Sequence, residues 1–122
     1  MTAARPSRLA VALFVLALAV QVYSVYAPDS PAQPTFANED KIAHALLFGM
    51  PVAIAWATGL RPRLVTGIIA LHAPVSELVQ HYVLPHRSGD VWDAVADLVG
   101  VLLGLLAGRA IARLVSRSSS RW

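Results

Sequence analysis

The chain has 122 residues, of which 57% are hydrophobic, and this apolar fraction exceeds the roughly 45–50% of soluble domains, so one membrane-embedded domain is predicted. Cysteine is absent, which excludes disulfides, thiolate metal sites and cysteine nucleophiles. The net charge of +3 comes from arginines that flank apolar segments, a pattern that indicates membrane anchors and not a nucleic-acid-binding patch.

The first apolar run, residues 9–27, is close to the ~20 residues that a transmembrane helix needs. A secretory signal peptide is the alternative, since small residues precede Pro28. A retained helix is favoured because the run is longer than a signal-peptide core and a proline would follow the cleavage site. A segment with several prolines follows the first run. At its end, Asn38 is expected to cap the second helix, with Glu39 and Asp40 in the first turn.

The second run, residues 42–60, has a polar face at its beginning. At 100° per residue, four side chains fall within about 80° of one another: Lys41, His44, Phe48 and Pro51. We therefore expect Lys41 and His44 to lie at the outer end of this helix.

The third run, residues 64–84, carries His72, Ser76, Glu77 and Gln80. Glu77 would lie roughly 10 Å below the outer end of the helix at 1.5 Å per residue. A carboxylate at that depth requires a polar environment inside the bundle. His72 is expected to bond to a backbone carbonyl that the nearby proline frees.

The fourth run, residues 91–108, begins with acids and continues with glycines. These residues share an arc of about 80°: Asp90, Asp93, Asp97, Gly100, Gly104 and Gly108. Small residues at every fourth position let another helix approach closely, so this face is expected to pack on protein. Asp90 also suits a helix N-cap. Residues 109–122 are expected to form a solvated cytoplasmic tail.

If the chain crosses the membrane four times, its basic and acidic residues lie mostly at opposite ends of the bundle. Eight basic residues would lie at the end that holds both termini: Arg5, Arg8, Arg61, Arg63, Arg109, Arg113, Arg117 and Arg121. All seven acids would lie at the other end, with Lys41 and Arg87. By the positive-inside rule the arginine-rich end faces the cytoplasm. The sequence thus predicts an all-α, four-helix transmembrane bundle with both termini cytoplasmic and a polar site on the extracytoplasmic side.

Glu77 and Asp97 are expected at similar depths on neighbouring helices. They cannot both stay charged there without a proton, a cation or basic partners. The partners in reach are Lys41, His44 and Arg87. No catalytic residue can be assigned and no cofactor is indicated, although an acid-rich set with one histidine would suit Mg²⁺ or Mn²⁺ better than Zn²⁺.

Three motifs follow one another in order: Asp40-Lys41-x-x-His44, then Glu77-x-x-Gln80, then Arg87, Asp93, Asp97, Gly100 and Gly104. In order and spacing they resemble the VanZ-like family of small bacterial membrane proteins, over residues 40 to about 108. The family usually has asparagine where this chain has Asp97, so this site has one more acid. The founding member is associated with teicoplanin resistance. The resemblance implies a multi-pass protein of the bacterial plasma membrane, with glycopeptide resistance as an analogy.

The first hypothesis is an envelope protein whose outward-facing pocket binds a lipid head group, a cell-wall precursor or a lipoglycopeptide. The candidate site residues are Lys41, His44, Glu77, Gln80, Arg87, Asp93 and Asp97. Lys41 and Arg87 would hold an anionic group, while the acids orient them or contact an amine.

Two alternatives stay open. One is a membrane enzyme acting on a lipid-linked substrate, with His44 and the carboxylates binding a divalent cation or acting as acid and base. No nucleophile motif supports it. The other is a proton- or cation-coupled carrier that uses Glu77 and Asp97, which the tightly packed glycine face opposes.

Overall fold

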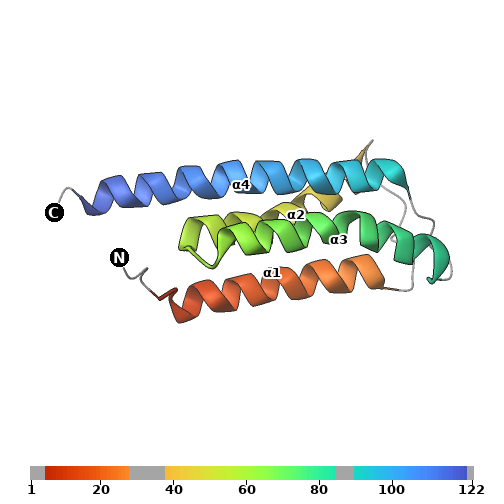
Figure 1. The fold of residues 1–122 in the computed structure, drawn as a ribbon, viewed down its shortest axis with the longest axis horizontal. Coiled ribbons are helices and arrows are strands. Elements are labelled where there is room, and N and C mark those ends of the chain that lie inside the picture. Colours follow the sequence, from red (N-terminus) through yellow and green to blue (C-terminus); the bar gives the residue numbers. More distant parts are fainter. Residues whose placement is uncertain (1–4, 28–37, 85–89, 121–122) are drawn as a thin grey trace.

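The computed structural model describes residues 5–27, 38–84 and 90–120. These residues form four α-helices that run alternately up and down in a bundle (Figure 1). The helices are α1 (Arg8–Tyr26), α2 (Glu39–Thr58), α3 (Pro62–Tyr82) and α4 (Val91–Ser119). The predicted all-α fold is confirmed.

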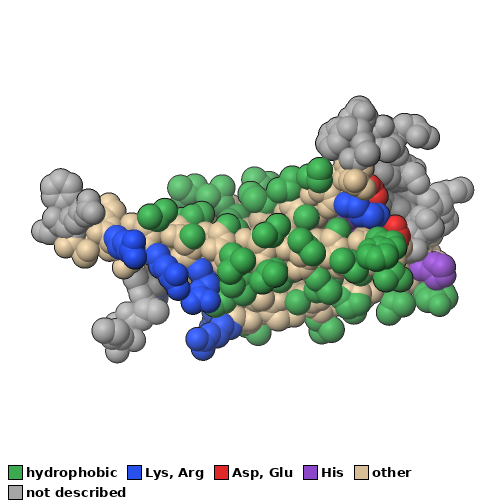
Figure 2. All heavy atoms as spheres, turned by 90° about the horizontal axis from the view of Figure 1, so that it is seen from above, with side chains coloured by type: hydrophobic (Ala, Val, Ile, Leu, Met, Phe, Trp, Pro, Cys, Tyr) green, Lys and Arg blue, Asp and Glu red, His purple; other side chains and the backbone are tan. Residues whose placement is uncertain are grey.

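Three of these helices, α1, α2 and α4, are long and apolar enough to cross a membrane. At 1.5 Å per residue, the 19 residues of α1 and the 20 of α2 extend about 30 Å, the thickness of a bilayer's hydrocarbon core. Leucine, isoleucine and valine side chains cover much of the helices' outer surface (Figure 2). Such a surface suits lipid, so the structure supports a membrane protein.

The helix ends differ in how they are capped. The Ser7 hydroxyl accepts from the Ala10 amide at the start of α1, and the Asp90 carboxylate accepts from the Trp92 amide at the start of α4. Asn38 does not cap α2 through its side chain, contrary to expectation. Its φ of 65° is left-handed, whereas a capping side chain needs an extended backbone to reach the first-turn amides.

The fourth helix is longer than expected. It has 29 residues and continues to Ser119, so most of the segment expected to be a tail is helical. No glycine or proline interrupts the residues that follow Gly108, which lets the helix propagate. Its last turns extend past the turn between α2 and α3 (Figure 1).

Helices α2 and α4 pack so closely that their backbones are in contact. A Cβ added to Gly100 would lie 2.1 Å from the Ala45 carbonyl oxygen, and one added to Gly104 would lie 2.3 Å from that of Gly49. A Cβ added to Gly108 would lie 2.5 Å from the Ala53 carbonyl oxygen. The glycines of α4 therefore lie against a matching row of small residues on α2: Ala45, Gly49 and Ala53.

A small apolar core lies between the four helices. It consists of Val25, Phe48, Val52, Ile69, Ala73 and Val101. Phe48 stacks on the His72 ring, with 5.5 Å between ring centroids. The apolar core is thus in contact with His72, a polar side chain of α3.

Candidate functional site

Charged side chains gather at opposite ends of the bundle. In Figure 2 the basic side chains cluster toward the end where α4 projects, while acidic groups and a further basic side chain lie at the other end. The acid-rich end is formed by the starts of α2 and α4 and the last turns of α3. These three helices supply two adjoining groups of side chains.

The first group is the lysine cluster, formed by Asp40, Lys41, Asp90 and Asp93. The Lys41 Nζ lies 3.0 Å from Asp40 Oδ2 and 2.9 Å from Asp90 Oδ2, and it also contacts Asp93 Oδ1. The three donors of the ammonium thus meet three carboxylates. The hydrogen bond from Lys41, followed by that from the Trp92 amide, holds the pKa of Asp90 below its usual range.

This arrangement changes the expected role of Lys41. It was expected to hold an anionic ligand together with Arg87, but it is already paired with three carboxylates. Arg87 lies outside the described residues. The lysine cluster is acidic, with three carboxylates around one ammonium, so it favours a positively charged group over a further anion.

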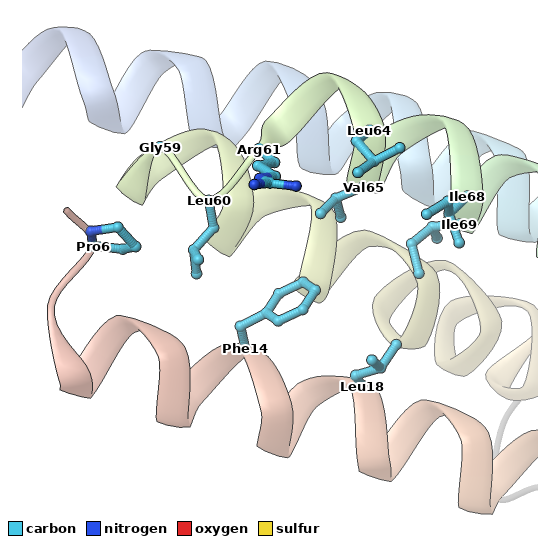
Figure 3. Close-up of a pocket in the computed structure, with 10 residues that line it drawn as sticks. All are labelled: Pro6, Phe14, Leu18, Gly59, Leu60, Arg61, Leu64, Val65, Ile68 and Ile69. Atoms are coloured by element: carbon cyan, nitrogen blue, oxygen red, sulfur yellow. The ribbon is translucent and has the colours of Figure 1, made fainter. Parts of the chain in front are cut away.

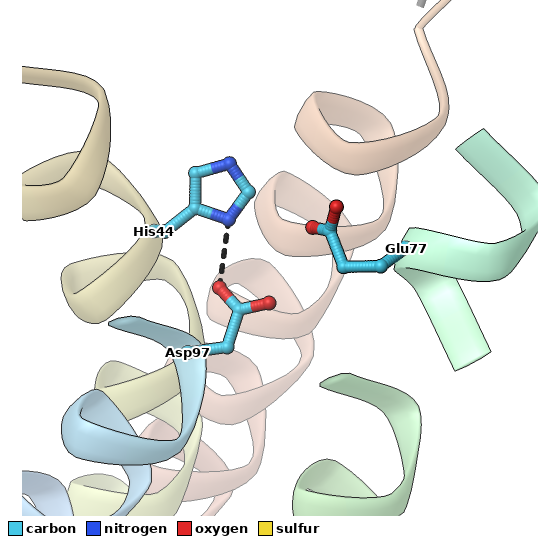
Figure 4. A group of neighbouring side chains, drawn as sticks. All are labelled: His44, Glu77 and Asp97. Carbon is cyan, nitrogen blue, oxygen red and sulfur yellow. Dashed lines mark hydrogen bonds and ion pairs between the residues drawn. The ribbon is translucent and has the colours of Figure 1, made fainter. Parts of the chain in front are cut away.

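The second group is the histidine cluster, formed by His44, Glu77 and Asp97 from α2, α3 and α4 (Figure 4). The His44 Nδ1 lies 2.7 Å from Asp97 Oδ1, and its Nε2 lies 3.6 Å from Asp93 Oδ2. The Asp90 amide donates to Glu77 Oε2 at 2.9 Å. His44 therefore joins the two clusters, and Glu77 reaches from α3 to the start of α4.

Two oxygens of the histidine cluster have no hydrogen-bond partner. Asp97 is fully buried and Glu77 is 7% exposed. Asp97 Oδ2 and Glu77 Oε1 are the buried side-chain atoms without a partner in the part of the chain that the structure describes. Buried polar atoms are nearly always paired, so these two mark a place where a further group can bind.

Gln80 is not bonded to either cluster. Its side-chain amide donates to the Val25 carbonyl at 2.7 Å and so connects α3 to α1. Gln80 was expected in the polar site as part of the Glu77-x-x-Gln80 motif. In the structure its described hydrogen bond fixes the position of α1 instead.

A partly buried chain of polar side chains also runs between α1 and α3. The His72 ring bonds to the Tyr26 hydroxyl at 2.7 Å and to Gln21 Oε1 at 3.1 Å, while Gln21 donates to the Leu47 carbonyl. The expected bond from His72 to a proline-freed carbonyl is therefore wrong. Gln21 was overlooked, although a glutamine inside an apolar run was a readable signal.

Two cavities of the described part of the chain lie away from both clusters. One of about 440 Å³ opens between α1 and α3 toward the arginine-rich end, where Phe14 and Leu18 approach Val65 and Ile69 (Figure 3). Another of about 300 Å³ lies between α1 and α2, lined by residues such as Leu16, Leu47 and Met50. Their linings are apolar, so neither is the polar pocket expected from the sequence.

No protein-family model matches the chain, and no curated protein or solved structure is significantly similar to it. The resemblance to the VanZ-like family is therefore supported only by the order and spacing of the motifs. The lysine and histidine clusters are therefore the features of this chain that bear on its function.

Proposed function

We propose that this chain is a multi-pass envelope protein of the bacterial plasma membrane that binds a cell-surface ligand at its acid-rich end. The observation that carries the proposal is the buried histidine cluster lying directly beneath the partly exposed lysine cluster. Intramembrane acids are costly, and they occur mainly where they serve a function.

The proposed topology has four crossings. The third helix, α3, is 21 residues long and packs against the other three helices. With α3 crossing as well, the arginine-rich end and both termini lie in the cytoplasm. The lysine and histidine clusters then face the extracytoplasmic side.

The charge of the clusters defines the chemistry of the ligand. Five carboxylates (Asp40, Glu77, Asp90, Asp93 and Asp97) and Lys41 sum to a formal charge of −4 when His44 is neutral. A group bearing an ammonium fits this charge, as in the head group of an amine-bearing lipid, a cell-wall precursor or a lipoglycopeptide. A contribution to glycopeptide resistance is proposed only by analogy with the VanZ-like family.

Native mass spectrometry of detergent-purified protein tests this proposal. We expect an amine-bearing lipid or lipid-linked precursor to co-purify with the wild type and to be lost in Asp93→Asn, because Asp93 lies where the two clusters meet. Arg113→Gln, an exposed change at the opposite end, serves as the control. Retention of the same ligand by Asp93→Asn, or co-purification of anionic lipids alone, would reject the acid-rich end as the binding site.

A further inference from the structure

We propose that His44, Glu77 and Asp97 bind a divalent metal cation. Each residue offers one ligand atom, and these atoms lie within 4.8 Å of one another (Figure 4). The inference goes beyond the ligand site proposed above, since it assigns a resident ion to the buried floor of that site.

The unpaired oxygens give the first reason. One oxygen of each carboxylate is used, Glu77 Oε2 by the Asp90 amide and Asp97 Oδ1 by His44. The other two, Glu77 Oε1 and Asp97 Oδ2, are buried and have no partner within the described ranges. A buried acceptor without a donor is costly, and one cation between the two carboxylates would satisfy both.

The orientation of His44 gives the second reason. If Nδ1 binds the metal, it gives up its hydrogen bond with Asp97 Oδ1. The proton is then on Nε2, which faces Asp93 Oδ2 at 3.6 Å. Asp93 is itself held by Lys41. A metal-bound histidine usually donates its other ring N–H to a carboxylate, which fixes the tautomer and strengthens the ligand. Lys41 and Asp93 are thus positioning residues for His44.

Charge balance gives the third reason. Two carboxylates and a neutral imidazole carry a charge of −2, and a divalent cation brings this buried group to zero. A single shared proton would leave one negative charge in a low-dielectric environment. Lys41 does not supply the missing charge, because its ammonium already contacts three other carboxylate side chains.

The donor set indicates the class of metal. Two carboxylate oxygens and one imidazole nitrogen suit Mn²⁺, which accepts both ligand types, with Mg²⁺ and Zn²⁺ as competitors. Ligands at about 2.2 Å from a metal are at most about 4.4 Å apart. A small rotation of the Glu77 or Asp97 side chain would therefore close the site.

The full chain, purified in detergent and stripped with EDTA, is titrated with Mn²⁺ while electron paramagnetic resonance records free Mn²⁺. We expect one saturable ion per chain. Glu77→Gln and Asp97→Asn should each weaken binding by on the order of 100-fold, and Asp93→Asn by about 10–100-fold. Glu39→Gln removes an acid in the first turn of α2 that belongs to neither cluster, so it should bind like the wild type. Competition with Mg²⁺ and Zn²⁺ then ranks the metals.

Absence of saturable binding of all three metals would overturn the proposal, as would unchanged binding in the Glu77→Gln/Asp97→Asn double variant. An equal loss in Glu39→Gln would indicate nonspecific attraction and count against it too. Circular dichroism checks folding, and His44→Gln replaces any carboxamide variant that misfolds. Co-purification of the amine-bearing ligand is measured in EDTA, so a failure of the metal proposal can be told apart from a failure of the proposed function.

Discussion

Among single residues, Lys41 supplies the positive charge that offsets the carboxylates of the lysine cluster. Its ammonium contacts three carboxylates from two helices, and its side chain is 28% exposed. Without this ammonium, Asp40, Asp90 and Asp93 would repel one another at short range. The lysine therefore holds the start of α2 against the start of α4.

We expect Lys41→Gln to lower the free energy of unfolding by about 1 kcal/mol at neutral pH, because partly exposed ion pairs contribute little each. Thermal unfolding in detergent measures the change. Arg113→Gln, which removes an exposed positive charge at the other end, should have a smaller effect. An equal loss of stability in both variants would contradict a specific role for the lysine cluster.

The pH dependence of this effect follows from Asp90. Lys41 lowers the pKa of Asp90 in the folded state, so the stabilisation is present above the unfolded pKa of about 4 and is lost as the pH falls through the folded value. The stability difference between wild type and Lys41→Gln should thus shrink below about pH 4. A difference that grows on acidification would be inconsistent with this pairing.

At the scale of helices, the α2–α4 pair is the closest contact in the bundle. Three glycines of α4 lie against Ala45, Gly49 and Ala53, with no room for a β-carbon. The same face of α4 carries Asp93 and Asp97 nearer its start. Close backbone packing therefore fixes the distance between His44 on α2 and Asp97 on α4, which form a 2.7 Å contact.

We expect Gly104→Ala to destabilise the bundle by about 1–3 kcal/mol, because the added methyl group would lie 2.3 Å from the Gly49 carbonyl oxygen. Gly67→Ala is the matched control, since a Cβ there has nothing within 4 Å. Thermal melting of both variants in the same detergent measures the difference. Equal stability would show that α2 and α4 are not packed through this face in the membrane.

At the scale of the whole molecule, the bundle is electrically polar. Arginines flank the start of α1, the α2–α3 turn and the end of α4, while the two clusters occupy the opposite end. A potential difference across the membrane and the positive-inside rule both favour one orientation of such a bundle. The proposed topology therefore places the two ends in different compartments.

Reporter fusions test the orientation. A reporter placed before Arg5 and another placed after residue 122 should both report the cytoplasm. A third reporter, inserted between α3 and α4, should report the extracytoplasmic side. A cytoplasmic signal from the α3–α4 insertion would contradict four crossings and would remove the outward-facing site.

Features that depend on neighbours along one helix could be predicted from the amino-acid sequence. Four apolar segments, the acid-and-glycine face of α4 and the placement of Lys41 and His44 at one end follow from periodicity and helical rise. Backbone hydrogen bonds in lipid must be satisfied within each segment, so composition alone is enough to predict helices. The family resemblance and the topology stay predictions.

The contacts between side chains of different helices could not be predicted in this way. Gln80 and Glu77 are neighbours on α3, yet Gln80 bonds to α1 while Glu77 reaches the start of α4. His72 meets Tyr26 and Gln21 on α1, and Lys41 is surrounded by carboxylates instead of being free for an anion. These pairings depend on the rotation and relative depth of helices that are distant in sequence. Side-chain packing between helices sets both quantities, and no periodicity within one helix contains them.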